Sequence, residues 1–155
     1  ITRDQILRKL IAQIILVNDE RIPDEIHLNR IYFGDFSDAE VFREENDIDI
    51  LVVSERSQFV LIIENKIYHR ESPHQLKKYL KSVESTYRDA NFSILPVYLT
   101  IGGDDPIGSD RYCRLSHKQI LEVVSLTLRL NQDRMPNQIR NFIQYYLDNV
   151  TLEIQ

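Results

Sequence analysis

The sequence predicts an α/β fold with the element order αβββαβ, a mixed central sheet flanked by helices, and two extra C-terminal helices. Three observations predict it. Residues 3–17 carry apolar side chains at helical spacing, residues 40–67 form three strand-like segments joined by short turns, and a helical segment separates these from a fourth strand at 92–100. A helix that connects two strands returns the chain in the same direction, so the fourth strand should run parallel to the third.

The first helix is indicated by apolar residues that recur every three or four positions, opposite a basic face. These residues are Ile6, Leu7, Leu10, Ile11, Ile14 and Ile15. Residues 18–39 are polar and irregular. Within them Tyr32, Phe33 and Phe36 indicate that part of the segment packs, and we expect a short strand leading into the sheet.

The sheet strands before the crossover are expected over 40–45, 48–54 and 59–67. The turn 55–58 has neither Gly nor Asn, so we expect a four-residue loop rather than a tight two-residue turn. A loop centred on this segment fixes the antiparallel register. It sets Asp49 opposite Glu64, and Asp47 opposite Lys66, with the opposed side chains close together.

The third strand is an apolar, β-branched run that ends in two charged residues, Glu64 and Lys66. Such a run is typical of a buried central strand, in which an unpaired charge costs several kcal/mol. The two residues share one face of the strand because they are two positions apart. If Asp49 lies opposite, two carboxylates meet there and require a proton or a cation between them. The alternative is a strand-end ion pair, with Asp49 as a turn or cap residue.

The remaining elements follow from caps and punctuation. Pro96 within the fourth strand indicates an edge position or an interruption. The helices are expected over 73–88, from the Ser116 cap to about Leu130, and from Met135-Pro136 to about Asn149. We expect residues 1–155 to form a single domain; the chain begins at Ile1 rather than Met, which leaves a truncated N-terminus open.

The composition is that of a globular protein, with 43% hydrophobic and 28% charged residues among 155. The single Cys113 excludes an internal disulfide and a Cys-rich zinc site, and fits a reducing cytoplasm. No apolar stretch approaches the roughly 20 residues of a membrane span. We therefore expect a cytoplasmic protein that does not bind membranes.

The net charge of −5 is unevenly distributed. Acidic residues dominate from Asp35 to Glu55, whereas basic residues dominate from Lys66 to Lys81. Two solvated faces that attract each other would account for this pattern. A cation site beside an anion-binding rim is the alternative explanation.

Two carboxylates beside a lysine form a site with specific chemistry. Paired carboxylates suit Mg²⁺ or Mn²⁺, which prefer oxygen ligands and retain several waters. Such a metal lowers the pKa of a bound water and stabilises charge on a phosphodiester. Lys66 could position that water, or accept its proton if the pKa of the lysine is depressed by burial and by the metal. The combined chemistry is metal-assisted hydrolysis of a phosphodiester.

At these residues the sequence resembles the PD-(D/E)XK nuclease superfamily, which has the restriction-endonuclease-like fold. The family has an acid on the second strand and (D/E)-X-K on the third, matched by Asp49 and by Glu64-Asn65-Lys66. Members with Q-x-x-x-Y on the next helix are matched by Gln75 and Tyr79. The matches cover about residues 40–121.

The resemblance extends to a bacterial subgroup with an I-E-N-K-I third strand and a downstream Q-L-x-x-Y. The matching segments are Ile63–Ile67, Gln75-Leu76 and Tyr98-Leu99-Thr100, with Leu115-Ser116-His117 as a further candidate match. Ile48 stands where the family name has proline. Many members also have a glutamate on the first helix as a further metal ligand. Here the first helix offers only Asp4, so three alternatives stay open: that acid is absent, is supplied by Glu20, or is lost with a missing N-terminus.

The resemblance implies a role for each matched residue. Asp49, Glu64 and the backbone carbonyl of Asn65 would hold Mg²⁺ (or Mn²⁺), Lys66 would handle the attacking water, and Gln75 would orient water or phosphate. Tyr79, Glu44 and Asp47 are candidate accessory residues; Glu44 and Asp47 could instead be solvated, or paired with Lys66 or Arg43. Candidate phosphate contacts, for which solvated surface residues are the alternative, are His69, Arg70, His74, Lys77 and Lys78.

The sequence thus predicts a Mg²⁺-dependent nuclease, a phosphodiester hydrolase whose expected partner is nucleic acid, with DNA as the expected substrate and a homodimer as a candidate assembly. The alternative is a catalytically inactive nuclease-fold module that binds nucleic acid or a protein partner. A metal-dependent phosphohydrolase of small substrates is a weaker third interpretation, because the sequence has no glycine-rich phosphate loop.

Overall fold

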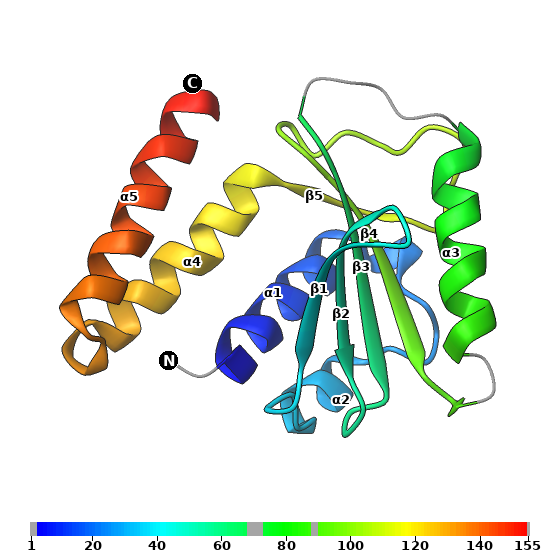
Figure 1. Ribbon diagram of the computed structural model, residues 1–155, viewed down its shortest axis with the longest axis horizontal. Coiled ribbons are helices and arrows are strands. Elements are labelled where there is room, and N and C mark those ends of the chain that lie inside the picture. The colour runs from blue at the N-terminus through cyan, green and yellow to red at the C-terminus, as the bar shows by residue number, and fades with distance from the viewer. Residues whose placement is uncertain (1–2, 68–72, 88–89, 155) are drawn as a thin grey trace.

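The computed structural model describes residues 3–67, 73–87 and 90–154, which form a five-stranded sheet with helices on both faces. Figure 1 shows α3 on one face of the sheet and α1 on the other, with α4 and α5 beyond α1. The elements are α1 (Arg3–Val17), η1 (Asp19–Arg21), α2 (Leu28–Phe33), β1 (Glu40–Glu45), β2 (Ile48–Ser54), β3 (Phe59–Lys66), α3 (Pro73–Tyr87), β4 (Ser93–Thr100), β5 (Cys113–Ser116), α4 (His117–Asn131), η3 (Gln132–Arg134) and α5 (Asn137–Ile154).

The sheet is mixed, as the sequence predicts. Its strand order is β1-β2-β3-β4-β5; the first three strands are antiparallel, and β4 and β5 run parallel to β3. The predicted αβββαβ core and the two C-terminal helices are confirmed. The short strand β5 and the helix α2 were not anticipated.

The hairpin of β2 and β3 has the predicted register. Its pairs run from Ile50 with Ile63 to Ser54 with Phe59, around the four-residue loop. The turn between β1 and β2 is shorter, with only Asn46 and Asp47 between the paired residues Glu45 and Ile48. Asn46 and Asp47 both have positive φ angles, 52° and 67°, which is the backbone of a two-residue type I′ turn.

Alternation along β3 divides its apolar residues between two cores. Leu61 and Ile63 pack with α1, whereas Val60 and Ile62 pack with α3. A strand buried on both faces must be apolar at nearly every position, which explains the continuous run from Phe59. A third, smaller cluster lies between α4 and α5.

The expectation that Tyr32 and Phe33 pack in a short strand is wrong. The segment forms α2, whose inward residue is Ile31, so the next two residues turn outward and are 72% and 80% exposed. Phe36 alone packs as expected, edge-on to Phe59 with ring centroids 5.6 Å apart.

Pro96 lies in an interior strand, so the edge alternative is wrong for β4 as a whole. Locally, however, the pairing of β4 with β5 begins only at Val97. Pro96 is paired with Ile62 of β3, and no β5 residue is paired with it. The missing amide hydrogen therefore falls where the β5 ladder has not yet begun, which makes the proline compatible with this strand.

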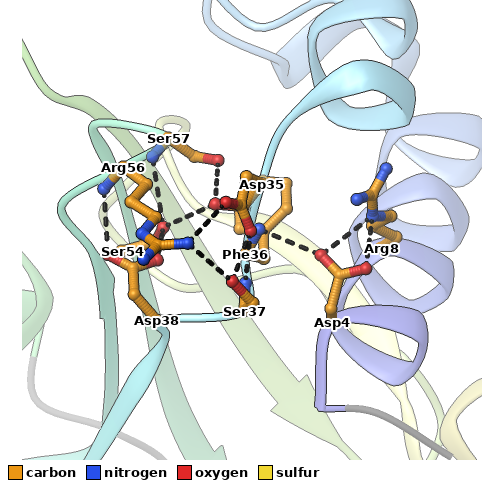
Figure 2. A network of polar contacts seen from close by, with 9 residues as sticks. All are labelled: Asp4, Arg8, Asp35, Phe36, Ser37, Asp38, Ser54, Arg56 and Ser57. Atoms are coloured by element: carbon orange, nitrogen blue, oxygen red, sulfur yellow. Dashed lines mark hydrogen bonds and ion pairs between the residues drawn. The ribbon is translucent and has the colours of Figure 1, made fainter.

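A polar network connects the N-terminal part of α1 to the turn between β2 and β3 (Figure 2). Arg56 contacts Asp35 at 2.8 Å, and the backbone amide of Phe36 donates to Asp4 at 2.9 Å. Hydrogen bonds from Ser37 and the contact with Arg56 hold the pKa of Asp35 well below its usual range. The network thus fixes residues 35–38, which lead into β1, against the turn between β2 and β3.

The C-terminal helices begin as predicted and extend further. Ser116 caps α4 in a capping box with Gln119, and α5 continues to Ile154 rather than ending near Asn149. Within the described ranges, no helix has both the length and the apolar character needed to cross a bilayer.

Cys113 should be unreactive until the protein unfolds. Its side chain is fully buried, and burial raises the pKa of the thiol to about 12, so the reactive thiolate is scarce at pH 8. We expect the thiol to react with Ellman's reagent at least about 100-fold more slowly in the native protein than in 6 M guanidinium. Equal rates in the two states would contradict the buried position of β5.

Candidate active site

Glu64 and Lys66 lie at the carboxyl end of β3, on the face covered by α3. Ile62, two residues earlier, packs with α3, and alternation places Glu64 on the same side. The Glu64 side chain is 1% exposed, and that of Lys66 is 21% exposed. The sheet and α3 thus hold a carboxylate in the interior with an ammonium at the margin.

The two charges form a close ion pair. Lys66 Nζ lies 2.6 Å from Glu64 Oε1. Burial raises the pKa of Glu64, and the charge of Asp49 raises it further, against the lowering effect of Lys66. Burial lowers the pKa of Lys66, but the hydrogen bond and charge of Glu64 outweigh it, so the pKa of Lys66 is raised. In this state the lysine holds its proton, and the depressed pKa needed for a proton acceptor is not present.

Asp49 reaches the site through an irregularity in the sheet. The pairing of β1 with β2 skips Glu44 and Asp49, and the pairing of β2 with β3 ends at Ile50. Asp49 Oδ2 accepts a hydrogen bond from the backbone amide of Asn65 at 2.7 Å. The expected opposition of Asp49 and Glu64 thus lies just beyond the paired residues, while the charge of Asp49 still acts on Glu64.

Gln75 and Tyr79 bring α3 to the same carboxylate. They are four residues apart and lie on one side of the helix. Gln75 Nε2 is 3.5 Å from Glu64 Oε1 and 2.5 Å from the Tyr79 hydroxyl. Because Tyr79 is buried, its hydroxyl holds the Gln75 amide in place beside the Glu64 carboxylate.

Other predicted residues lie outside this group. Asp47 is 3.5 Å from Lys78 rather than near Lys66, because the type I′ turn carries it to the surface; both partners are more than 70% exposed. Glu44 is exposed and has a positive φ of 56°. His74 and Lys77 are exposed on α3. His69 and Arg70 lie outside the described residues.

The structure also places Asp4, which is the acid that the first helix offers, and Glu20, which is its candidate substitute. Asp4 belongs to the network at the β2–β3 turn, about 17 Å along β3 from Glu64, so it cannot serve the site. Glu20 is exposed in η1, and among the described residues no hydrogen bond or ion pair joins it to Asp49 or Glu64.

The donor set fits a hard divalent cation. Glu64 Oε2 is buried and has no hydrogen-bond partner in the described part of the chain, which is unusual for a carboxylate oxygen. Asp49 offers a second carboxylate next to the Asn65 peptide. Among the described residues no cluster of three or more His, Cys, Asp or Glu side chains could hold a metal. Mg²⁺, which commonly uses one or two carboxylates and keeps its waters, fits such a sparse set.

Two contacts at the site were not foreseen from the sequence. The Asn65 side chain meets His117, with 3.1 Å between Oδ1 and Nε2. The Thr100 hydroxyl accepts from the amides of Gly103 and Asp104, and Thr100 pairs with Lys66. Strand alternation predicts that the Asn65 side chain points away from Glu64. Its partner, His117, is known only from the structure, which brings the junction of β5 and α4 next to Asn65.

Comparison with known proteins gives one result of consequence. The family model described as PD-(D/E)XK nuclease superfamily matches residues 2–148. Neither the curated proteins nor the solved structures give a match to the chain.

Removing the Lys66 charge should destabilise the metal-free protein. The Lys66→Met variant leaves Glu64 buried without its cation, and we expect a loss of about 3 kcal/mol in urea unfolding at pH 7 with a chelator present. The loss should shrink towards pH 5, because protonation of Glu64, whose pKa is raised, removes the unpaired charge.

Two further variants make this measurement specific. The double variant Glu64→Gln/Lys66→Met should recover most of the stability, since no charge is left buried. Lys81→Met, at an exposed position on the same helix as Gln75, should change the unfolding free energy by less than about 0.5 kcal/mol. A double variant as unstable as Lys66→Met would show that the ion pair is not the cause.

Proposed function

The chain belongs to the PD-(D/E)XK nuclease superfamily, and we propose that it is a Mg²⁺- or Mn²⁺-dependent nuclease that hydrolyses DNA within a single domain spanning residues 1–155. The single observation that carries the proposal is the buried Glu64 carboxylate, whose Oε2 has no donor among the described residues while Lys66 and Asp49 lie beside it. A buried acid that lacks a hydrogen-bond donor costs stability. Such groups cluster at functional sites, where their perturbed pKa serves the chemistry.

The roles of the residues follow from their contacts. Asp49, Glu64 and the Asn65 carbonyl would hold the ion, which when bound supplies positive charge that favours deprotonation of water and stabilises charge on the phosphate. Lys66, which reaches from Glu64 towards solvent, would handle the attacking water. Gln75, fixed against Tyr79, would orient that water or a phosphate oxygen.

The surface around the site favours approach of nucleic acid over α3. His74, Lys77 and Lys78 are exposed there and offer cationic or neutral donors to phosphates. The neighbouring β1–β2 hairpin carries exposed acids, including Glu45, which repel phosphates. Cutting both strands of a duplex would require two such sites, which a homodimer would supply.

A second candidate function rests on a different observation. The two carboxylates gain no third acid from the described residues, since Asp4 lies at the far end of β3. Together with a net charge of −5, this favours a module of the same fold that binds nucleic acid or a protein without cutting. Metal binding separates the two candidates.

Cleavage should depend on the metal and on the site. We expect the protein to cleave plasmid or single-stranded DNA with Mg²⁺ or Mn²⁺ and not with a chelator. Asp49→Ala and Lys66→Ala should each lower the initial rate by about 100-fold or more, the usual contribution of a group that acts on the proton or the charge of the reaction.

The exposed acid of η3 provides a matched control for these variants. Asp133→Asn should cleave at the wild-type rate, because the residue lies in the connection between α4 and α5. Equal cleavage by wild type, Asp49→Ala and Lys66→Ala would remove the assigned site. Absence of both cleavage and Mn²⁺ binding in wild type would favour the non-catalytic module.

Lys77 and Lys78 should contribute to affinity rather than to the chemical step. The ion pair of Lys78 with Asp47 is exposed at both ends and worth little, so the lysine remains available to phosphate. Each alanine substitution should weaken DNA binding and reduce the slope of log affinity against log salt by about 1. Arg134→Ala, at an exposed cation on η3, should leave the slope unchanged; slopes that match wild type in the lysine variants would move the DNA path away from α3.

A further inference from the structure

Asn65 faces away from the carboxylates that flank it. Glu64 and Lys66 point towards α3, so alternation directs the Asn65 side chain to the opposite face of the sheet, where Ile63 packs with α1. There its Oδ1 lies 3.1 Å from Nε2 of His117, which is 52 residues further along the chain. Because an amide oxygen only accepts, the imidazole donates from Nε2 in this contact.

His117 is held in a rigid setting. It is the first residue of α4 and directly follows Ser116, whose hydroxyl accepts from the Gln119 amide at 3.2 Å. Ser116 is also paired with Thr100, and Thr100 with Lys66. Three neighbouring strands therefore set the position of the imidazole relative to Asn65, and the capping box sets the direction in which α4 leaves the sheet.

The peptide group of Asn65 has two tasks in the proposed function. Its amide donates to Asp49 Oδ2 at 2.7 Å, which aims that carboxylate, and the residue's carbonyl is the third candidate ligand for the ion. Rotation of the Asn65 backbone would disturb both groups together. A side chain anchored on the far face opposes such rotation, because it adds a fixed point on the other side of the strand.

We propose that His117 is a positioning residue of this site: through Asn65 it fixes the peptide that orients Asp49 and offers a carbonyl to the divalent cation. The inference rests on the proposed function, since it concerns the same ion. In this proposal His117 acts on the site through its contact with Asn65. Residues that orient metal ligands in this way typically contribute 10- to 100-fold to metal affinity.

The test measures Mn²⁺ binding by calorimetry on the full 155-residue chain, together with thermal unfolding in a chelator. His117→Leu should raise the Kd for Mn²⁺ by about tenfold. His117→Gln, which retains a donor nitrogen at similar reach, should stay within about threefold of wild type. A role confined to stability would lower the unfolding temperature of His117→Leu without changing Kd at temperatures where the protein is folded.

Three further variants complete the experiment. Asn65→Leu should raise Kd as His117→Leu does, and the double variant should add little to either, since each substitution removes the contact between Asn65 and His117. If His117→Leu does not fold, Asn65→Leu together with His117→Gln provides the same comparison. His27→Leu, at an exposed histidine before α2, is the matched control and should bind Mn²⁺ as wild type does.

The outcomes separate the inference from the proposed function. Wild-type binding with an unchanged Kd in His117→Leu and Asn65→Leu overturns the positioning role and leaves the nuclease proposal standing. Additive losses in the double variant overturn the connection through Asn65. No Mn²⁺ binding by wild type overturns both proposals.

Discussion

The structure depends on a carboxylate buried at the end of a central strand. Glu64 is almost inaccessible, and one of its oxygens has no donor among the described residues. Desolvating a carboxylate costs several kcal/mol, which a single lysine repays only in part. Two neighbouring side chains offset part of that cost: Lys66 lies 2.6 Å from the carboxylate and Gln75 lies 3.5 Å from it.

The sheet supplies what the carboxylate requires. β3 is apolar on both faces over its first five residues, so its register and depth are strongly specified, and the charged residues at its end are carried to a defined place. Where charge begins, regular pairing with β2 ends. This break frees Asp49 from the ladder and allows its carboxylate to accept from the Asn65 amide. In β3, the regularly paired apolar residues of the core are therefore followed directly by the residues of the candidate site, which are no longer paired with β2.

Much of this could be predicted from the sequence because it depends on local pattern. The apolar run of β3 and the loop before it predicted the hairpin register, and helical spacing brought Gln75 and Tyr79 to one side of α3. The prediction that Asp47 lies opposite Lys66 was wrong, because Asn46 and Asp47 form a turn with two positive φ angles. This turn carries the Asp47 side chain away from Lys66. β5 and the contact between Asn65 and His117 could not be predicted, since four residues give little periodicity and the contact spans two crossovers.

The uncovered strand β1 has a consequence for the behaviour of the protein at high concentration. It forms one edge of the sheet, and its outer backbone groups would be free to pair with a strand of another molecule. Its side chains are mostly charged, and the positive φ of Glu44 interrupts its regular extension. Repulsion between like edges and a broken ladder both oppose end-to-end sheet growth, so the acidic hairpin that borders the candidate site also protects the protein against aggregation.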